Sequence, residues 1–337
     1  MSSDVRTLST AHEDGDALPV GVIGVGSMGS NHARILSQLQ GANLIGVNDV
    51  DQHRASDVAL SNGTHALERS ELLRSVDAVS VAVPTAYHYE VVKECIEAGV
   101  DVLVEKPFVD DIAKGKELAR LARRNDIVLQ VGHIERFNPA VQAVIDIVSD
   151  IELIAISATR VGPPLSRMVS DDVVLDLMVH DLDIVLAIAG EIPTTIDATG
   201  RRDGQYATAQ LTFPDELVCT LTASRVTQRR MREMEITCNN CQITVDYLDQ
   251  SVNIHRHASP EYTQNDGTIA YRNESVIERP LIETEEPLKR ELSAFIEASR
   301  NDSTPVVTAE DGLRVLEVAI EITREVGIQT EPKVYSQ

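Results

Sequence analysis

The spacing of apolar and polar residues changes about 140 residues into the chain. Before that point, segments of helical spacing separate continuous apolar runs, which lie at 20–24, 44–49, 77–84, 101–107 and 127–133. The helical segments include 27–40, 88–99 and 111–126. Apolar runs joined by helices are typical of buried parallel strands. We therefore expect an α/β domain with a doubly wound parallel sheet over residues 19–138.

After Pro139 many segments show apolar residues at every second position rather than in continuous runs. One helix is expected at 141–150, a strand at 151–161 and a single helix at 173–190. Alternating apolar and polar residues then recur in short runs up to residue 257, which indicates an antiparallel sheet with one buried face. Residues 258–287 show no clear period and read as a loop, and two further helices are expected at 287–301 and 309–327. Residues 139–330 are thus expected to form an α+β domain with a large, open, mostly antiparallel sheet.

The charge balance narrows the choice of partners. Acidic side chains number 53 and basic ones 30, a net charge of −23 that repels phosphate backbones and anionic lipids. We therefore expect neither nucleic acid nor membrane as a partner, and no apolar run approaches the ~18 residues that span a bilayer. The acid excess, together with few lysines and no tryptophan, is typical of proteins from a salt-rich cytoplasm. An acidic protein from an ordinary cytoplasm is the alternative.

The N-terminal segment and the cysteines suggest no catalytic chemistry. Residues 1–18 are polar and acidic, without a basic and then apolar leader pattern, and read as a disordered tail on a cytoplasmic protein. Cys238-Asn-Asn-Cys241 lies between two alternating runs, where Asn-Asn suits a tight hairpin turn. A disulfide or a metal pair at these cysteines is the alternative. No metal is expected, because no second pair of ligands follows at zinc spacing.

A glycine-rich motif opens the first helix. Gly24-Val-Gly26-Ser27-Met28-Gly29 follows one predicted strand and begins the next helix. In that context the glycines allow a tight turn, the approach of a pyrophosphate and close helix packing, while the helix N-terminus favours phosphate charge. We expect Gly24, Gly26, Ser27, Met28 and Gly29 to bind a dinucleotide.

An acidic residue at the end of the second strand bears on which dinucleotide is bound. Asp49 lies 20 residues beyond Gly29, where a carboxylate accepts hydrogen bonds from the ribose hydroxyls and repels a 2′-phosphate. NAD is therefore expected rather than NADP. Arg54 keeps the NADP alternative open, because a side chain folded back toward the ribose could accept that phosphate.

Two sets of polar residues are candidates for the chemistry. Lys106 follows an apolar strand at its carboxyl end, where open α/β sheets bind ligands, and a cis peptide to Pro107 would aim its side chain. Asp176 and His180 are four residues apart in a predicted helix, so the carboxylate would orient the imidazole as a general base. The structural alternatives are a buried ion pair at Lys106 and a core histidine at His180.

Taken together, these motifs resemble those of the Gfo/Idh/MocA oxidoreductases. The glycine motif, Pro84, Glu105-Lys106-Pro107 and the stretch from Asp176 to His180 occur in the family's order over residues 19–330. The resemblance implies a Rossmann domain, cofactor contacts from Pro84, His88, Glu105 and Lys106, and a catalytic cluster of Lys106, Asp176 and His180. It also implies a small-molecule sugar or polyol substrate and a homodimer or homotetramer. Whether Lys106 or His180 is the base stays open.

Two further stretches resemble the UDP-N-acetylglucosamine 3-dehydrogenases of this family. They are residues 132–139 (Gly-His-Ile-Glu-Arg-Phe-Asn-Pro) and residues 160–164 (Arg-Val-Gly-Pro-Pro), which run on toward Arg167. Arginine side chains suit a diphosphate, so substrate binding is expected at Lys106, Arg136, Asn138, Arg160, Arg167 and His180. Ordinary surface arginines are the alternative. A glycine usual before the catalytic helix is missing in Asp171-Asp172-Val173.

Three functions therefore stand as hypotheses. The first is an NAD-dependent dehydrogenase that oxidises a sugar nucleotide, UDP-N-acetylglucosamine at C3. The second is a dehydrogenase of free sugars or inositols, which needs no phosphate-binding arginines. The third is a dinucleotide-binding regulator without catalysis, against which the joint presence of Lys106, Asp176 and His180 argues.

Overall fold

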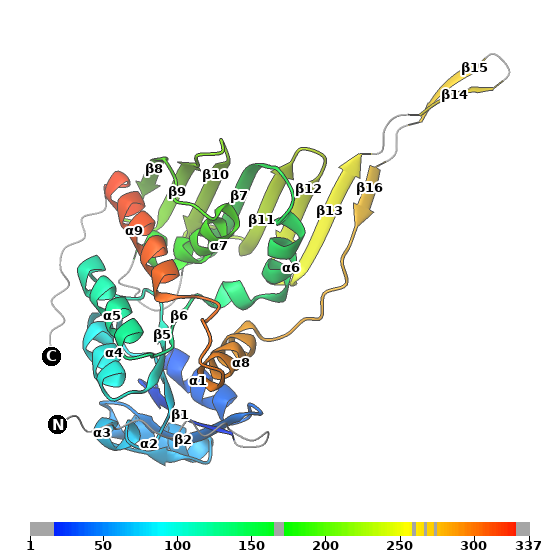
Figure 1. Ribbon diagram of the computed structural model, residues 1–337. Coiled ribbons are helices and arrows are strands. Elements are labelled where there is room, and N and C mark those ends of the chain that lie inside the picture. Colours follow the sequence, from blue (N-terminus) through cyan, green and yellow to red (C-terminus); the bar gives the residue numbers. More distant parts are fainter. Residues whose placement is uncertain (1–16, 165–171, 258–260, 266–267, 273–274, 328–337) are drawn as a thin grey trace. The chain divides into compact units, whose positions relative to one another are not determined.

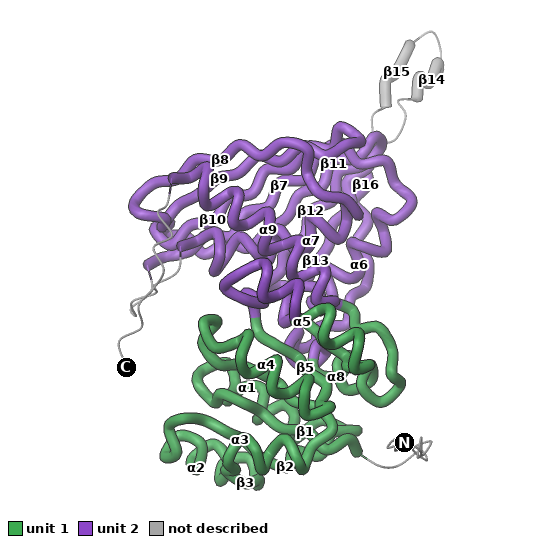
Figure 2. The backbone as a smooth tube through the Cα atoms, turned by 60° about the vertical axis from the view of Figure 1, so that its left-hand side comes forward, with its two compact units in different colours: residues 1–105, 118–130, 292–306 green, residues 106–117, 131–291, 307–337 purple. Residues whose placement is uncertain are grey.

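The computed structural model describes residues 17–164, 172–257, 261–265, 268–272 and 275–327. Its contacts divide the chain into two compact units, shown in different colours in Figure 2. The first unit comprises residues 1–105, 118–130 and 292–306, and the second comprises residues 106–117, 131–291 and 307–337. Each unit therefore contains several separate stretches of the chain.

A six-stranded sheet carries the glycine motif. Its strands lie in the order β3-β2-β1-β4-β5-β6, and every pairing recorded among the first five is parallel. The chain winds outward from β1 first through β2 and β3, then through β4, β5 and β6, which confirms the expected doubly wound sheet. In this order the switch between β1 and β4 opens at the carboxyl ends of the strands, where such sheets bind ligands. The strands are β1 Leu18–Ile23, β2 Ala42–Asn48, β3 His65–Ala66, β4 Ala78–Val81, β5 Asp101–Glu105 and β6 Leu129–Gly132.

Helices connect these strands, each with one apolar face. In α1, Ala33, Ile35 and Leu36 are buried. Asp51 is the N-cap of α2, and its side chain accepts hydrogen bonds from the N–H groups of the first turn. Two short elements, β3 and α3, lay outside the predicted set because neither reaches a full apolar period. The helices up to β6 are α1 Ser27–Leu36, α2 Gln52–Ser61, α3 Arg69–Leu72, a 3₁₀ turn Thr85–Tyr87, α4 His88–Glu97 and α5 Ile112–Arg124.

The second unit is built on an eight-stranded sheet in the order β16-β13-β12-β11-β7-β10-β9-β8. Only β7 and β10 pair in parallel among the recorded pairings, which confirms a mostly antiparallel sheet. Side chains alternate along most of the strands: in β10, for example, Cys219 and Leu221 are buried, while Thr220 and Thr222 are half-buried. The strands are β7 Leu153–Val161, β8 Thr195–Arg201, β9 Tyr206–Thr212, β10 Val218–Ser224, β11 Met231–Cys238, β12 Gln242–Asp246, β13 Ser251–His257 and β16 Ser275–Glu278.

Helices α6, α7 and α9 cover one face of this sheet (Figure 1). Their apolar side chains and the alternate residues of the strands form one core that includes Val144, Leu182, Leu211, Ile236 and Ile322. The remaining elements after β6 are a 3₁₀ turn Ile134–Phe137, α6 Pro139–Val148, a π-turn Val174–Met178, α7 Val179–Ala189, α8 Pro287–Arg300 and α9 Ala309–Glu325.

Three expectations about this unit can be compared with the structure. The hairpin at Asn239-Asn240 is confirmed, because β11 and β12 pair antiparallel on either side of it. The loop expected at 258–287 is wrong in part: β14 Glu261–Asn265 pairs with β15 Thr268–Arg272, and β16 pairs with β13. Residues 275–278 of β16 are all exposed, so this strand has no buried face that would produce an alternation of apolar and polar residues in the sequence. The single helix expected at 173–190 begins instead with the π-turn.

Candidate functional site

The glycine motif forms the turn between β1 and α1. Gly24 has a φ of +86°, and a Cβ there would meet the Ala82 backbone at 2.8 Å. A Cβ at Gly29 would lie 1.7 Å from the Gly24 carbonyl oxygen, so the helix packs directly on the turn. Both glycines are therefore required by the fold itself.

At Gly26, in contrast, the fold does not require a glycine. Its φ is −66°, and a Cβ built there meets nothing within 4 Å. It is the N-cap of α1, with Ser27 and Met28 in the first turn, so the open space lies beside backbone N–H groups at the positive end of the helix. A pyrophosphate fits this position, because a side chain would keep its oxygens away from the backbone.

Asp49 holds the motif in place. Its Oδ2 accepts a hydrogen bond from the Val25 N–H at 2.8 Å, and its Oδ1 accepts one from the Asp51 N–H at 2.9 Å. The Arg54 guanidinium lies 3.5 Å from the same carboxylate and 3.2 Å from Asp51, with about half of its side chain exposed. The carboxylate thus fixes the turn as well as standing at the strand end where a ribose is expected.

A buried histidine that the sequence pattern did not single out links the ends of three elements. His32 of α1 pairs through Nε2 with Glu105 of β5 at 3.0 Å and through Nδ1 with the Ser80 hydroxyl of β4 at 2.6 Å. His88 is also buried, and its Nε2 donates to the Val83 carbonyl at 2.9 Å. Pro84, in contrast, is exposed at the start of the 3₁₀ turn.

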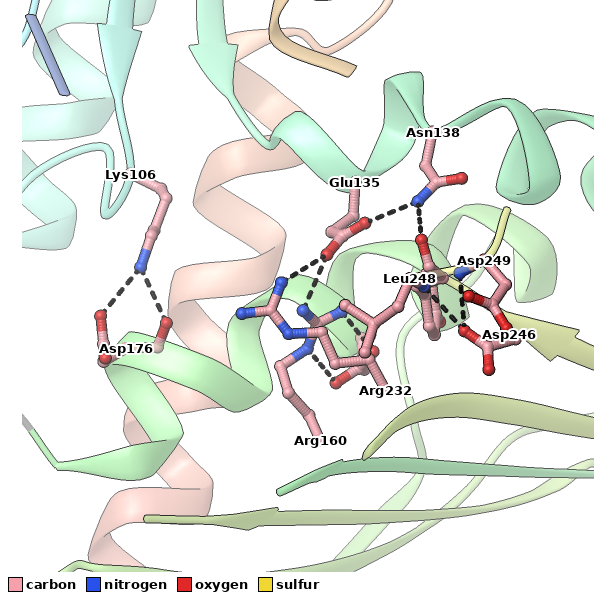
Figure 3. A network of polar contacts seen from close by, with 11 residues as sticks. Lys106, Glu135, Asn138, Arg160, Asp176, Arg232, Asp246, Leu248 and Asp249 are labelled. Atoms are coloured by element: carbon pink, nitrogen blue, oxygen red, sulfur yellow. Dashed lines mark hydrogen bonds and ion pairs between the residues drawn. The ribbon is translucent and has the colours of Figure 1, made fainter. Parts of the chain in front are cut away.

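In the second unit, Lys106 and Arg225 both bind Asp176. The Lys106 Nζ donates to the Asp176 carbonyl at 2.8 Å and to its Oδ1 at 3.2 Å, as Figure 3 shows, while Arg225 donates to Oδ2. Burial raises the pKa of Asp176, but the charges of Lys106 and Arg225 outweigh it and bring this pKa below its usual value. The Lys106–Pro107 peptide is cis. We name Lys106, Asp176 and Arg225 the Asp176 clamp.

The expected pairing of Asp176 with His180 is wrong. The π-turn Val174–Met178 widens the chain just where an α-helix would have stacked the two side chains, and no hydrogen bond joins them. His180 Nδ1 is buried without a hydrogen-bond partner in the part of the chain that is described. Burial, followed by the positive charges of Lys106 and Arg160, holds the pKa of His180 well below its usual value, so the imidazole is neutral.

Two of the arginines expected near a diphosphate bind carboxylates instead. Arg160 donates to both oxygens of Asp181 at 2.8 and 2.9 Å and to Glu135 at 2.7 Å, and it is almost fully buried. Arg136 donates to both oxygens of Asp183, at 2.9 and 2.6 Å. These contacts explain the two arginines without a ligand, although they do not test substrate binding directly.

Asn138 and Arg167 complete the set of expected substrate residues. Asn138 is buried: its amide nitrogen donates to Glu135 and to the Tyr247 carbonyl, and its oxygen caps α6 (Figure 3). Arg167 lies outside the described residues. Among residues that sequence reasoning missed, Arg225 had one signal, its position directly after an alternating strand.

Comparisons with known proteins agree with these features. The family model for the NAD-binding Rossmann fold of this oxidoreductase family matches residues 18–133, and the model for the GFO/IDH/MocA C-terminal domain matches residues 158–244. The UDP-N-acetylglucosamine 3-dehydrogenase of Acidithiobacillus ferrooxidans is 32% identical over 90% of this chain and 95% of its own. A crystal structure of that enzyme superposes with a TM-score of 0.83 at 30% identity, covering 93% of this chain and 99% of its own.

More distant relatives act on inositols. The scyllo-inositol 2-dehydrogenase (NAD(+)) of Bacillus subtilis is 26% identical over 90% of this chain and 92% of its own. Sheet order, glycine motif and matched models together define an oxidoreductase that uses a nicotinamide dinucleotide and a small-molecule substrate. The chain belongs to the Gfo/Idh/MocA family. None of the helices described is long and apolar enough to cross a membrane.

Proposed function

We propose that this protein oxidises the C3 hydroxyl of UDP-N-acetylglucosamine to the 3-keto sugar nucleotide, with NAD as the oxidant. The similarity to the Acidithiobacillus enzyme over nearly the whole of both chains supports the substrate. The observation that carries the chemistry is a neutral, half-buried imidazole at His180 in the same unit as an ammonium at Lys106 held by Asp176.

The roles of these residues follow from their protonation. His180 accepts the hydroxyl proton, because its imidazole is neutral and Nδ1 has no competing hydrogen bond among the described residues. Lys106 donates a hydrogen bond to the substrate oxygen and stabilises the negative charge that develops there. Asp176 orients the ammonium with its carbonyl and carboxylate. The bound nicotinamide accepts the hydride.

The choice of NAD over NADP is also a proposal. Asp49 at the end of β2 favours free ribose hydroxyls, and Arg54 is held between the carboxylates of Asp49 and Asp51 rather than left open to a phosphate. Gly24, Gly26, Ser27, Met28 and Gly29 are proposed to hold the pyrophosphate, with Pro84, His88 and Glu105 at the neighbouring strand ends.

The cellular setting is proposed from composition and cysteines. The four cysteines are free thiols and all are buried, which suits the reducing cytoplasm. The net charge of −23 suits a salt-rich interior, where ions screen self-repulsion. We also propose a homodimer or homotetramer, because the residues facing away from the core in the eight-stranded sheet are only half-buried by their own unit.

The test is NADH formation at high salt with UDP-N-acetylglucosamine, compared with myo-inositol, scyllo-inositol and free aldoses. We expect turnover with the sugar nucleotide and at least ~100-fold lower kcat/KM with the others, since the free sugars and inositols lack the diphosphate that a sugar-nucleotide site binds. Faster turnover of an inositol would assign the protein to the inositol dehydrogenases instead. Tight NAD binding with no turnover of any substrate would support the regulator.

A further inference from the structure

Arg232 lies opposite a second arginine. It is in β11, directly paired with Arg160 of β7, so the two side chains share one face of the sheet. Like charges at directly opposite positions destabilise a sheet unless they are neutralised. Arg160 is neutralised by Asp181 and Glu135. The Arg232 Nη1 lies 3.8 Å from Glu135, beyond hydrogen-bond distance, and one third of its side chain is exposed (Figure 3).

The surroundings of Arg232 are short of negative charge. Within the described residues no atom accepts a hydrogen bond from its guanidinium, and Glu135 is already bound to Arg160. Burial and the charges of Arg160 and Arg230 together lower the pKa of Arg232, while the charges of Glu135 and Asp181 oppose them. This shortage is notable in a chain with 53 acidic residues, none of which forms a close ion pair with this arginine in the described structure.

Arg232 also acts on a proposed catalytic residue. The charge of Arg232 also contributes to lowering the pKa of His180, after burial, Lys106, Arg160 and His133, so it acts on the proposed base. A half-buried guanidinium whose N–H groups make no hydrogen bond among the described residues is suited to an anionic part of the substrate.

The chemistry of the substrate class supplies such an anion. In a nucleoside diphosphate hexose, C1 carries the diphosphate and C3 carries the hydroxyl to be oxidised. The two carbons belong to one ring, so the cation that binds the phosphate must lie about one sugar ring from the base. A guanidinium presents parallel N–H donors that match two phosphate oxygens.

We propose that Arg232 binds the diphosphate of a nucleoside diphosphate sugar and so selects this substrate class over neutral sugars and polyols. The inference rests on the proposed function and adds the subsite that recognises the charged part of the substrate. It also assigns to Arg232 the role that the sequence pattern suggested for Arg136 and Arg160, whose donors are bound to carboxylates.

The first test is kinetic. Arg232→Ala is expected to raise the KM for UDP-N-acetylglucosamine by ~10- to 100-fold, because charged hydrogen bonds to the diphosphate are lost. The kcat should change less than about threefold, and the KM for NAD should stay the same. Arg232→Lys keeps the charge and should recover part of the loss. The matched control is Arg229→Ala, an arginine three residues away that is three-quarters exposed and 3.8 Å from Glu233. A KM for Arg232→Ala equal to that of the control would overturn the proposal.

The second test measures binding without turnover, so that it stands apart from the proposed function. UDP is titrated calorimetrically into wild type, Arg232→Ala, Arg232→Lys and Arg229→Ala at one salt concentration. We expect ~10-fold or weaker binding for Arg232→Ala, partial recovery for Arg232→Lys and no change for the control. UDP that binds wild type and Arg232→Ala equally, or that does not bind wild type, overturns the subsite. Failure of wild type to oxidise any sugar nucleotide overturns the proposed function, and the UDP result then judges the subsite alone.

Discussion

Two groups of charged side chains in the second unit have opposite ratios of cations to carboxylates. In the group around Arg160, one buried cation is shared by two carboxylates, those of Asp181 and Glu135. In the Asp176 clamp, one carboxylate is shared by two cations, and about one third of its side chain is exposed. The side chains of Arg160, Asp181 and Glu135 are all buried, whereas the clamp is open to solvent at Asp176.

This difference indicates that one group of residues in the unit stabilises the fold and the other serves the reaction. A buried arginine with bidentate and single carboxylate contacts cannot leave them without a large cost, so it fixes β7 against its neighbours. In the Asp176 clamp the carboxylate orients the Lys106 ammonium, a donor that suits an oxygen that becomes negative during the reaction. We therefore expect substitutions in the first group to change mainly stability and substitutions in the clamp to change mainly turnover.

The largest expected effect is on stability. Arg160→Ala leaves Asp181 buried without its cation and should lower the free energy of unfolding by about 3–5 kcal/mol. Urea or guanidinium unfolding at constant salt measures it, with the exposed Arg229→Ala as control. A loss similar to the control would mean that Arg160 does not hold the fold together.

The next effect is on turnover. Lys106→Ala and His180→Ala should each lower kcat by at least ~100-fold, about 2.7 kcal/mol in activation free energy, because one removes the oxyanion donor and the other the base. Affinity for NAD should stay nearly the same, as measured by fluorescence titration of NADH. A mild loss of turnover removes that residue from the proposed catalytic cluster.

A smaller effect is expected at Arg225, which acts through Asp176. Arg225→Ala should lower kcat about tenfold, and Arg225→Lys should recover much of it. Because Arg225 lowers the pKa of Asp176, its removal raises that pKa, and the acid limb of the kcat profile should move to higher pH. An unchanged pH profile beside a lowered kcat would show that Arg225 only supports the local structure.

The smallest effect concerns a carboxylate with no cation. Burial raises the pKa of Asp101 to about 6, partly offset by the Val128 N–H, while Asp77 and Asp302 add repulsion. A raised pKa favours the folded state at low pH, and this contribution is lost as the pH rises through about 6. Asp101→Asn should therefore stabilise the protein by roughly 1 kcal/mol above neutral pH and not at pH 4, as thermal unfolding at both values would show.

The sequence predicted those parts of the fold that depend on the spacing of apolar residues within one strand or helix. Apolar runs and helical spacing located the six-stranded sheet, the glycine turn and Asp49, since strand, turn and helix follow one another within a few residues. The strands β14 to β16 were not predicted, because no regular period marks them in the sequence, and β16 has no buried face. Lys106 was found from its place at a strand end, which is also a local property.

The partners within the site could not be predicted in the same way. A π-turn leaves no trace in apolar spacing, so Asp176 and His180 were expected to pair. Arg225 reaches Asp176 across 49 positions of sequence, and His32 reaches Glu105 across 73. Such pairs depend on which strands become neighbours, and for the same reason the ion pair of Arg160 with Asp181 could not be predicted.

The two hydrogen bonds of His32 have a mechanical consequence. The side chain ties α1, the helix that begins at the glycine turn, to β4 through Ser80 and to the last residue of β5 through Glu105. Glu105 directly precedes Lys106 in the chain. The imidazole therefore couples the position of α1 to the carboxyl end of β5, so that a displacement of the helix is felt at Glu105.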